Sequence, residues 1–174
     1  MNEVIKTIFE RHSTRAFTDA PISKDELILL ADAARQAPSA RNRQSWHFTV
    51  IANPALIVEL ANAMADALGV DRESYRFYSA TALILCGSDR ADPLGIENCA
   101  CAMENIFLAA HSLGIASVWI NQLKGICDEP AVRAVLSKAG LPENCVVYGT
   151  AALGYAAKEF QKPERATGTV NFAM

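Results

Sequence analysis

The sequence contains no long hydrophobic run. Its apolar segments are shorter than the roughly 20 residues that a membrane-spanning helix needs, and residues 1–6 lack the apolar core of a cleavable leader. We therefore expect no membrane span and no membrane partner. The five cysteines are odd in number and follow no repeated spacing. This argues against a disulfide framework and favours a reducing compartment, the cytoplasm.

The net charge of the sequence is also small. The 16 Lys and Arg residues against 19 Asp and Glu residues give a formal net charge of −3, which is too little positive charge for a nucleic-acid-binding surface. Of the 174 residues, 51% are hydrophobic and 20% are charged, which excludes a disordered chain and predicts one folded domain over residues 1–174. The arginines that do cluster suggest a small anionic ligand.

Motifs of several common enzyme classes are absent. Gly149 and Gly154 have the spacing of a phosphate-binding P-loop, but Tyr155 and Ala156 occupy the positions that need Lys and Ser or Thr. No G-x-G-x-x-G follows a predicted strand and no G-x-S-x-G elbow occurs, so neither a Rossmann dinucleotide site nor a serine hydrolase is supported. The three histidines have no partner at metal-ligand spacing, so we expect no metal site.

Hydrophobic periodicity predicts an alternation of helices and strands. Predicted helices cover residues 2–10, 24–37, 53–67, 96–113 and 128–140, and predicted strands cover residues 48–51, 81–86, 116–120 and 145–154. Ser23 and Glu26 form a capping box at the start of the second helix. Gly87 is expected to end the second strand, and Asp128 to cap the last helix. The class is therefore α/β or α+β, with helices covering a sheet.

The predicted helix over residues 96–113 is apolar around most of its circumference and is rich in alanine and cysteine. A helix with this pattern is buried, either in the core of a protein or at a subunit interface. Residues alone leave both alternatives open, and for a chain of this length the interface is at least as well supported.

The segment around Arg11 carries the strongest polar cluster. Arg11, Ser13 and Arg15 occupy alternate positions, so in an extended segment their side chains could face one anion. Guanidinium groups suit phosphate because their forked donors match its oxygen atoms. Taken alone, the segment is explained better as an ordinary solvated turn.

Two further clusters have the same character. The loop before the first strand contains Ser39, Asn42 and Gln44, whose hydroxyl and amide groups can bond the polar edge of a planar ring. The tail contains Lys162 and Arg165. Each cluster also has an explanation that involves no ligand: the first can be a capped loop, and the second can be a charged C-terminus.

In order and spacing these clusters resemble the FMN-dependent nitroreductase family, of which this chain would be a short member. The similar blocks are residues 11–17, 37–48, 104–114, 153–155 and 162–165. The resemblance implies an α+β sandwich whose central, mostly antiparallel sheet is flanked by helices. It also implies a homodimer with two flavins at the interface, in which residues 96–113 pack against their twin. The C-terminal arms would be exchanged, with Val170 and Phe172 adding an edge strand to the neighbouring sheet.

The resemblance also assigns residues to the cofactor, FMN. Arg15 corresponds to a basic residue near the flavin N1 and O2 edge, where a cation stabilises negative charge on the reduced ring. The loop is expected to reach the ring or ribityl chain from the partner subunit, and the backbone around residues 119–122 is expected to approach flavin N5. The positions assigned to the phosphate are Arg11, Ser13, Lys162 and Arg165, and His12 is assigned to the cofactor without a stated contact. The other cofactor-binding positions are Pro38, Ser39, Asn42, Gln44, Trp119 and Asn121.

The sequence departs from the family pattern in the loop and in one connection. Arg41 and Ser45 stand where Gly and Pro are common, and only ten residues separate Gly87 from Asn98, where many relatives carry longer insertions. A short connection predicts a more open pocket.

The implied function is that of an FMN-dependent oxidoreductase with ping-pong kinetics. NADH or NADPH would give hydride to flavin N5 and leave, and a nitroaromatic, a quinone or a similar small aromatic acceptor would then take the electrons. No catalytic side chain is needed beyond the flavin and the stabilising charge of Arg15. An alternative is a flavin-binding or storage protein with little turnover, which the short connection favours. A module that has lost FMN is disfavoured because Arg11, Ser13, Arg15 and Asn42 are retained.

Overall fold

The computed structural model describes residues 1–159, 162, 164–165, 168 and 170–174. Its centre is a four-stranded sheet with the order β1-β2-β4-β3, made of β1 (Trp46–Ile51), β2 (Ala82–Asp89), β4 (Cys145–Gly154) and β3 (Ala116–Ile120). Each strand pairs with its neighbour in antiparallel fashion. The α+β class with an antiparallel sheet is confirmed, and the described strands contain none of the parallel pairs that an alternation of helices and strands would favour.

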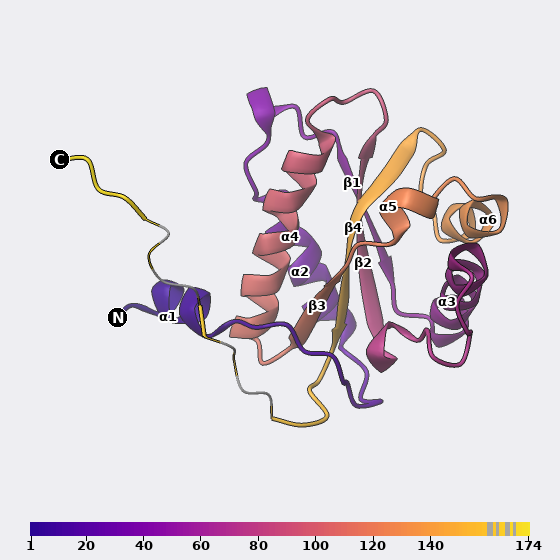
Figure 1. Cartoon of the computed structure of the whole chain (residues 1–174), viewed down its shortest axis with the longest axis horizontal. Helices are drawn as coiled ribbons and strands as arrows, with labels where there is room; N and C mark the ends of the chain where they lie inside the picture. Colours follow the sequence, from indigo (N-terminus) through magenta and orange to yellow (C-terminus); the bar gives the residue numbers. More distant parts are fainter. Residues whose placement is uncertain (160–161, 163, 166–167, 169) are drawn as a thin grey trace.

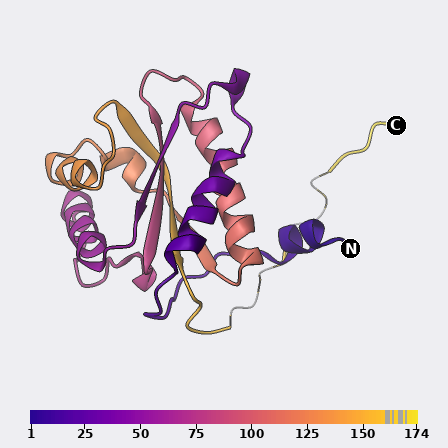
Figure 2. The same cartoon turned by 180° about the vertical axis from the view of Figure 1, so that it is seen from behind.

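Helices cover both faces of this sheet (Figures 1 and 2). One face carries α2 (Lys24–Arg35) and α4 (Gly95–Ser112), and the other carries α3 (Pro54–Leu68), α5 (Leu123–Ile126) and α6 (Pro130–Lys138). Ile84 of β2 points into the core beneath α2 and α4, while Leu83 and Leu85 point into the core beneath α3 and α6. The alternation of side chains along one strand therefore serves two cores.

Local signals explain where several elements begin. Ser23 and Glu26 form both halves of the predicted capping box, since the Glu26 amide donates to Ser23 Oγ at 3.2 Å and the Ser23 amide donates to Glu26 Oε2 at 3.0 Å. The Asn53 side chain caps α3, whose first residue is Pro54. Gly114, with φ +74°, follows the end of α4 in a conformation that favours glycine.

Two local predictions are wrong. Strand β2 continues through Gly87 to Asp89, because a register shift between Cys86 and Gly87 lets the strand bend without ending. Asp128 does not cap α6, whose first turn is preceded by Glu129. The Asp128 carboxylate instead accepts hydrogen bonds from Arg90 at 2.8 and 2.9 Å and from Arg133 at 2.6 Å. Two guanidinium groups outcompete the backbone amides for this carboxylate.

The first helix packs only lightly against the described part of the chain. Helix α1 (Glu3–Glu10) lies near the C-terminal end of α4 (Figure 1), and none of its residues is buried. Val4 and Phe9 are 65% and 62% exposed. Helix α4 buries Met103 and Ile106 against the sheet, yet it leaves Cys101 exposed on its other side. The outer surfaces of α1 and α4 are thus open to a further partner.

Among the described residues, no helix combines the length and the hydrophobicity needed to cross a membrane. The five cysteines are free thiols, of which four are buried and Cys101 is exposed. Burial raises the pKa of the Cys99 thiol to about 12, so this group stays protonated at neutral pH and belongs to the core.

Candidate functional site

Residues 11–17 run beside the edge of the sheet next to β3. Ser13 forms a parallel bridge with Ser117, and the Thr14 amide donates to the Ser117 carbonyl at 2.9 Å. Further along, Phe17 forms an antiparallel bridge with Ala156. These bonds fix the extended segment that the sequence predicts and place it against the start of β3.

A pocket of about 200 Å³ lies between this segment, the end of α4 and the start of β3. Its lining includes Arg11, His12, Thr14, His111 and Ser117. The Arg11 guanidinium lies 5.9 Å from the centre of the Phe107 ring, and Arg11 Nε lies 3.4 Å from Glu104 Oε1 in an ion pair. That buried Nε makes no hydrogen bond within the described residues, and its ion pair with Glu104 holds the guanidinium beside the pocket.

Arg11 and Lys162 bring positive charge to this pocket. Burial lowers the pKa of His111, and the neighbouring His12 lowers it further. The charges of Arg11 and Lys162 act in the same direction, while Glu10 opposes them. Lys162 therefore lies near His111 although it is remote in sequence. Such a set of nitrogen donors suits an anion with several oxygen atoms.

Trp119 extends the site along β3. Its ring centre lies 6.1 Å from that of Phe107, and the indole lies over Gly149, where a Cβ atom would come within 2.9 Å of it. Gly149 thus provides room for the indole, which remains 39% exposed. Asn121 follows at the exposed end of the strand. The result is a flat, partly apolar surface beside the cationic pocket, and such a surface can pack against a planar ring.

The loop over residues 38–45 lies at the other end of α4 (Figures 1 and 2). The Ala40 amide donates to Asn98 Oδ1 at 2.9 Å, near the start of that helix. His111, which lines the cationic pocket, comes 13 residues later. At 1.5 Å of rise per residue the two ends are about 20 Å apart. Within one chain the structure therefore does not bring the loop and the Arg11 segment together.

The remaining predicted site residues are exposed or only partly buried. Pro38, Asn42 and Gln44 are exposed, and Gln44 Nε2 donates to Asn42 Oδ1 at 2.7 Å. Ser39 and Ser13 are partly buried, and neither lines the cationic pocket. Arg15 and Arg165 are exposed, and Lys162 is partly buried. Pro163, in the basic tail, lies outside the described residues.

Several residues of this region escaped the sequence analysis. Glu104 and Phe107 lie in the similar block over residues 104–114, and Gly149 has the rejected P-loop spacing, but none of the three is assigned to the site from the sequence. Strand pairing and helix packing bring them beside Arg11 and Trp119.

A strained turn was missed as well. Phe77, Tyr78 and Ser79 have φ values of 48°, 59° and 65°, in the left-handed region that favours glycine. The Phe17 amide donates to the Tyr78 carbonyl at 3.2 Å, so this turn supports the segment that contains Arg15. Nothing in its sequence, which lacks glycine, indicates such a conformation.

Comparison with known proteins identifies the family. The model of the nitroreductase family matches residues 8–155, a range that includes the Arg11 segment, the loop and all four strands. The chain belongs to the nitroreductase family. A protein of Archaeoglobus fulgidus, provisionally named an NADH dehydrogenase/NAD(P)H nitroreductase, is 32% identical over 163 residues, covering 91% of this chain and 88% of the relative.

Solved nitroreductases share the fold. A Bacteroides fragilis nitroreductase with bound FMN is 38% identical with a TM-score of 0.95, covering 100% of both chains. A Desulfitobacterium hafniense nitroreductase with bound FMN is 29% identical with a TM-score of 0.88, again covering 100% of both chains. The resemblance stated from the sequence is confirmed for family and fold.

The residues of this chain fit FMN, which combines a phosphate, a polyhydroxyl chain and a planar ring. The cationic pocket, lined by Arg11, His12 and His111, offers nitrogen donors suited to the phosphate. The exposed Trp119 indole offers a surface suited to the ring. In the part of the chain that the structure describes, no group of three or more His, Cys, Asp or Glu side chains is placed to hold a metal ion.

Proposed function

We propose that this chain is an FMN-dependent oxidoreductase that takes reducing equivalents from NADH or NADPH and passes them to a small aromatic acceptor, such as a nitroaromatic or a quinone. The observation that carries the proposal is the cationic pocket at the β3 edge, with the exposed Trp119 indole beside it. Membership of the nitroreductase family and two FMN-containing relatives support the same cofactor. When bound, FMN supplies hydride chemistry at its ring, so no side chain has to act as a nucleophile.

In this proposal the residues of the chain bind the cofactor and orient its ring. Arg15 lies two positions beyond Ser13 on the exposed side of the same segment, where we place its cation at the electron-rich edge of the ring. Trp119 and Asn121 border the ring and limit the access of water. In the ping-pong order, the nicotinamide leaves before the acceptor enters. In this proposal Arg11, Ser13, Lys162 and Arg165 hold the phosphate, and His12 also contacts the cofactor.

We propose a homodimer because one chain carries only part of the site. If two copies pack through α4 around a two-fold axis with the helices antiparallel, the start of one α4 lies beside the end of the other. The loop of one subunit, including Pro38, Ser39, Asn42 and Gln44, then reaches the cationic pocket of its partner. The open outer surfaces of α1 and α4 are available for this packing.

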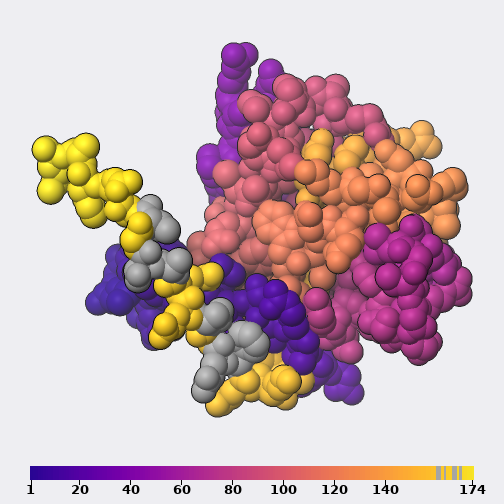
Figure 3. Space-filling view, viewed as in Figure 1, coloured from indigo at the N-terminus to yellow at the C-terminus, as the bar shows by residue number. Residues whose placement is uncertain are grey.

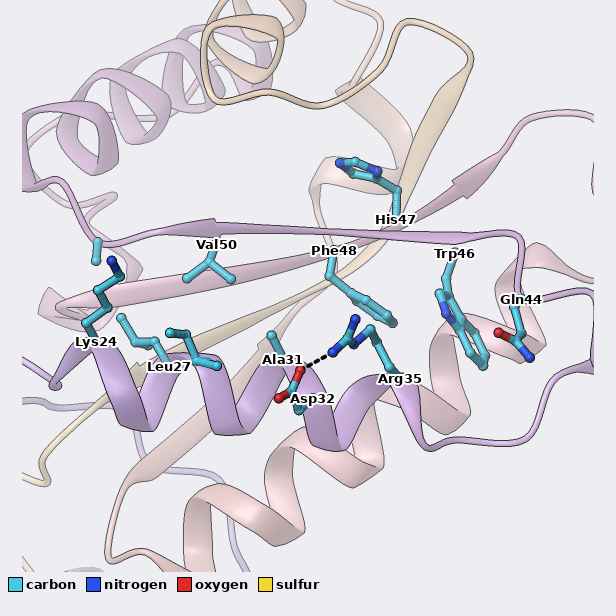
Figure 4. Close-up of a pocket in the computed structure, with 12 residues that line it drawn as sticks. Lys24, Leu27, Ala31, Asp32, Arg35, Gln44, Trp46, His47, Phe48 and Val50 are labelled. Carbon is cyan, nitrogen blue, oxygen red and sulfur yellow. Dashed lines mark hydrogen bonds and ion pairs between the residues drawn. The ribbon is translucent and has the colours of Figure 1, made fainter.

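The C-terminal residues provide a second dimer contact in this proposal. Figure 3 shows residues 170–174 standing clear of the body of the molecule, and Val170 and Phe172 are 67% and 81% exposed. A pocket of about 690 Å³ lies between α2 and the edge strand β1, where Trp46, Phe48 and Val50 point toward the helix (Figure 4). The alternate apolar residues of the partner's arm suit a strand added to this edge, with its side chains in the pocket.

We also propose a cytoplasmic location, on the ground that the five cysteines are free thiols. Cell fractionation tests this point, and recovery of the protein outside the cytoplasm would contradict it.

Stopped-flow reduction separates the enzyme from the alternative of a flavin-storage protein. The FMN-loaded protein is mixed anaerobically with NADH or NADPH, and flavin absorbance is followed. We expect bleaching within the turnover time, followed by recovery of the colour when a quinone is added. No bleaching within minutes by either nucleotide would contradict the enzyme proposal and favour storage.

The role of Arg15 has its own test. Arg15→Ala removes the cation that stabilises the reduced ring, so the flavin reduction potential should fall by roughly 30 mV or more, which corresponds to about 1.4 kcal/mol for two electrons. Arg72→Ala, at an exposed arginine that pairs with Asp66 of α3, is the control and should leave the potential unchanged. An unchanged potential in Arg15→Ala would contradict the assigned role.

A further inference from the structure

The buried carboxylate of Asp92 ties the 38–45 loop to the start of α4. The Asp92 side chain is only 4% exposed. It accepts hydrogen bonds from Ser45 Oγ and, at 3.2 Å, from Arg43 Nη1, both of which belong to the loop region. It also accepts from the Leu94 amide at 3.1 Å and from Asn98 Nδ2 at 3.1 Å, both at the start of α4. One carboxylate thus joins two segments that are distant in sequence.

Asn98 makes the junction two-sided. Its Nδ2 donates to Asp92, while its Oδ1 accepts from the Ala40 amide at 2.9 Å. The end of the loop is fixed independently, because the Ser45 carbonyl accepts from the Asp89 amide at 3.2 Å and from Ser88 Oγ at 3.1 Å. Buried polar groups that satisfy one another in this way specify a single arrangement.

The loop needs such anchors because its backbone is strained. Arg41, Asn42 and Gln44 have φ values of 55°, 53° and 49°, in the left-handed region that side chains other than glycine disfavour. Strained residues persist where their surroundings determine the conformation, and they concentrate at ligand-binding sites. Within the loop the Gln44 amide donates to Ser39 Oγ at 3.0 Å, and Asp92 and Asn98 add the bonds that tie the loop to the start of α4.

We propose that Asp92 is a positioning residue for the cofactor. Through Arg43 and Ser45 it holds the loop in the one shape that presents the polar side chains at positions 39, 42 and 44 to the FMN of the partner subunit. This inference rests on the proposed FMN function and on the shared site. It also explains the serine at position 45, where proline is common in the family, because the Ser45 hydroxyl donates to Asp92.

The position of Asp92 determines which part of FMN binding it affects. Asp92 and the loop lie at the start of α4, whereas the phosphate donors lie at the end of the same helix. In the antiparallel dimer the loop contacts the ring or the ribityl chain. Loss of Asp92 should therefore weaken FMN and riboflavin equally, since riboflavin lacks only the phosphate.

The experiment compares Asp92→Asn with Asp128→Asn in the full-length protein. Asp128 also pairs with two arginines, but it lies at the other face of the sheet, beside α6. Hydrogen exchange of residues 40–44 is measured with excess FMN, and equilibrium dialysis gives the FMN and riboflavin affinities. In Asp92→Asn we expect faster exchange and a loss of about tenfold for both flavins, with their ratio unchanged. Asp128→Asn should show neither effect.

Unchanged exchange and unchanged affinities in Asp92→Asn would overturn the inference. So would a loss confined to FMN, because it would place the effect at the phosphate. A wild-type protein that binds neither flavin would contradict the proposed function instead, while its exchange rates would still show whether Asp92 holds the loop. If Asp92→Asn does not fold, Ser45→Ala removes one donor of the same junction; it should give the same pattern at smaller size, and an unchanged loop would overturn the inference.

Discussion

At the scale of single residues, Arg11 supplies a permanent positive charge to the candidate site, and His111 supplies an imidazole beside it. Arg11 is held between the Phe107 ring and the Glu104 carboxylate, with its Nε buried and without a hydrogen bond in the described chain. Burial and the surrounding cations lower the pKa of His111. A bound phosphate reverses this balance, because a nearby anion favours the protonated imidazole.

Replacement of Arg11 tests the phosphate contact. Arg11→Ala should weaken FMN by about tenfold to a hundredfold, the range expected for a lost charge-assisted hydrogen bond, and should leave riboflavin almost unaffected. Arg11→Lys keeps the charge but not the forked donors, so an intermediate loss is expected. Equilibrium dialysis with both flavins measures these values. Equal losses of FMN and riboflavin in Arg11→Ala would contradict the assignment.

The pKa of His111 gives a pH dependence with a definite sign. The free protein has a lowered His111 pKa, and phosphate raises it, so the complex binds more protons than the free protein. FMN affinity should therefore increase as the pH falls from 8 to about 6.5, before phosphate itself takes up a proton near pH 6. FMN titrations across this range measure the slope. His111→Gln should flatten it and His47→Gln, on β1, should not; equal slopes in the wild type and His111→Gln would contradict this account.

At the scale of elements, signals that act within a few residues could be read from the sequence. The capping box at Ser23 and the proline that opens α3 located two helices, because each acts on its own backbone. The prediction that Gly87 ends the second strand was wrong because the register shift there depends on pairing with the neighbouring strand. The prediction that Asp128 caps the last helix was wrong because its actual partner, Arg90, lies 38 residues away in sequence.

Residues of the candidate site also differ in whether the sequence alone reveals them. The cationic segment at Arg11 stands out in the sequence because its residues are adjacent. Asp92, Phe107 and Gly149 do not, because their positions beside the site depend on how strands pair and helices pack. The left-handed conformation of Arg41 also has no local signal, since the anchors that impose it lie around residues 88–98.

The strained loop predicts opposite effects of glycine at two nearby arginines. Arg41→Gly, at φ 55°, should stabilise the protein by about 0.5 kcal/mol, because the relief of left-handed strain slightly exceeds the entropy gained by the unfolded chain. Arg43→Gly, at φ −67°, relieves no strain and loses a bond to Asp92, so it should destabilise by about 1–2 kcal/mol. Urea unfolding at one protein concentration measures both, and the same sign for both would contradict the account of strain.

At the scale of the whole molecule, the surfaces that expose apolar side chains lie together. Helix α1, the outer side of α4 and the C-terminal arm lie on one side of the molecule, and α3 and α6 lie on the other (Figures 1 and 3). The proposed site is divided between the two ends of α4. A two-fold pair of chains joins these halves and covers the exposed apolar residues at the same time.

The dimer predicts a specific dependence on the arm. Deletion of residues 170–174, or Phe172→Asp, removes apolar side chains from the proposed β1 edge contact, so the dimer dissociation constant should rise by about tenfold or more. Sedimentation equilibrium measures this change. Val70→Asp alters an exposed valine after α3, away from the interface, and should leave the dimer intact. An unchanged dissociation constant in the deletion would contradict arm exchange.

The absorption spectrum of the purified protein tests the central claim most directly. The account predicts a yellow protein with flavin bands, one FMN per chain, and loss of these bands when NADH or NADPH is added without oxygen. A colourless protein whose spectrum shows no flavin, and which takes up no FMN when the cofactor is added, would contradict it.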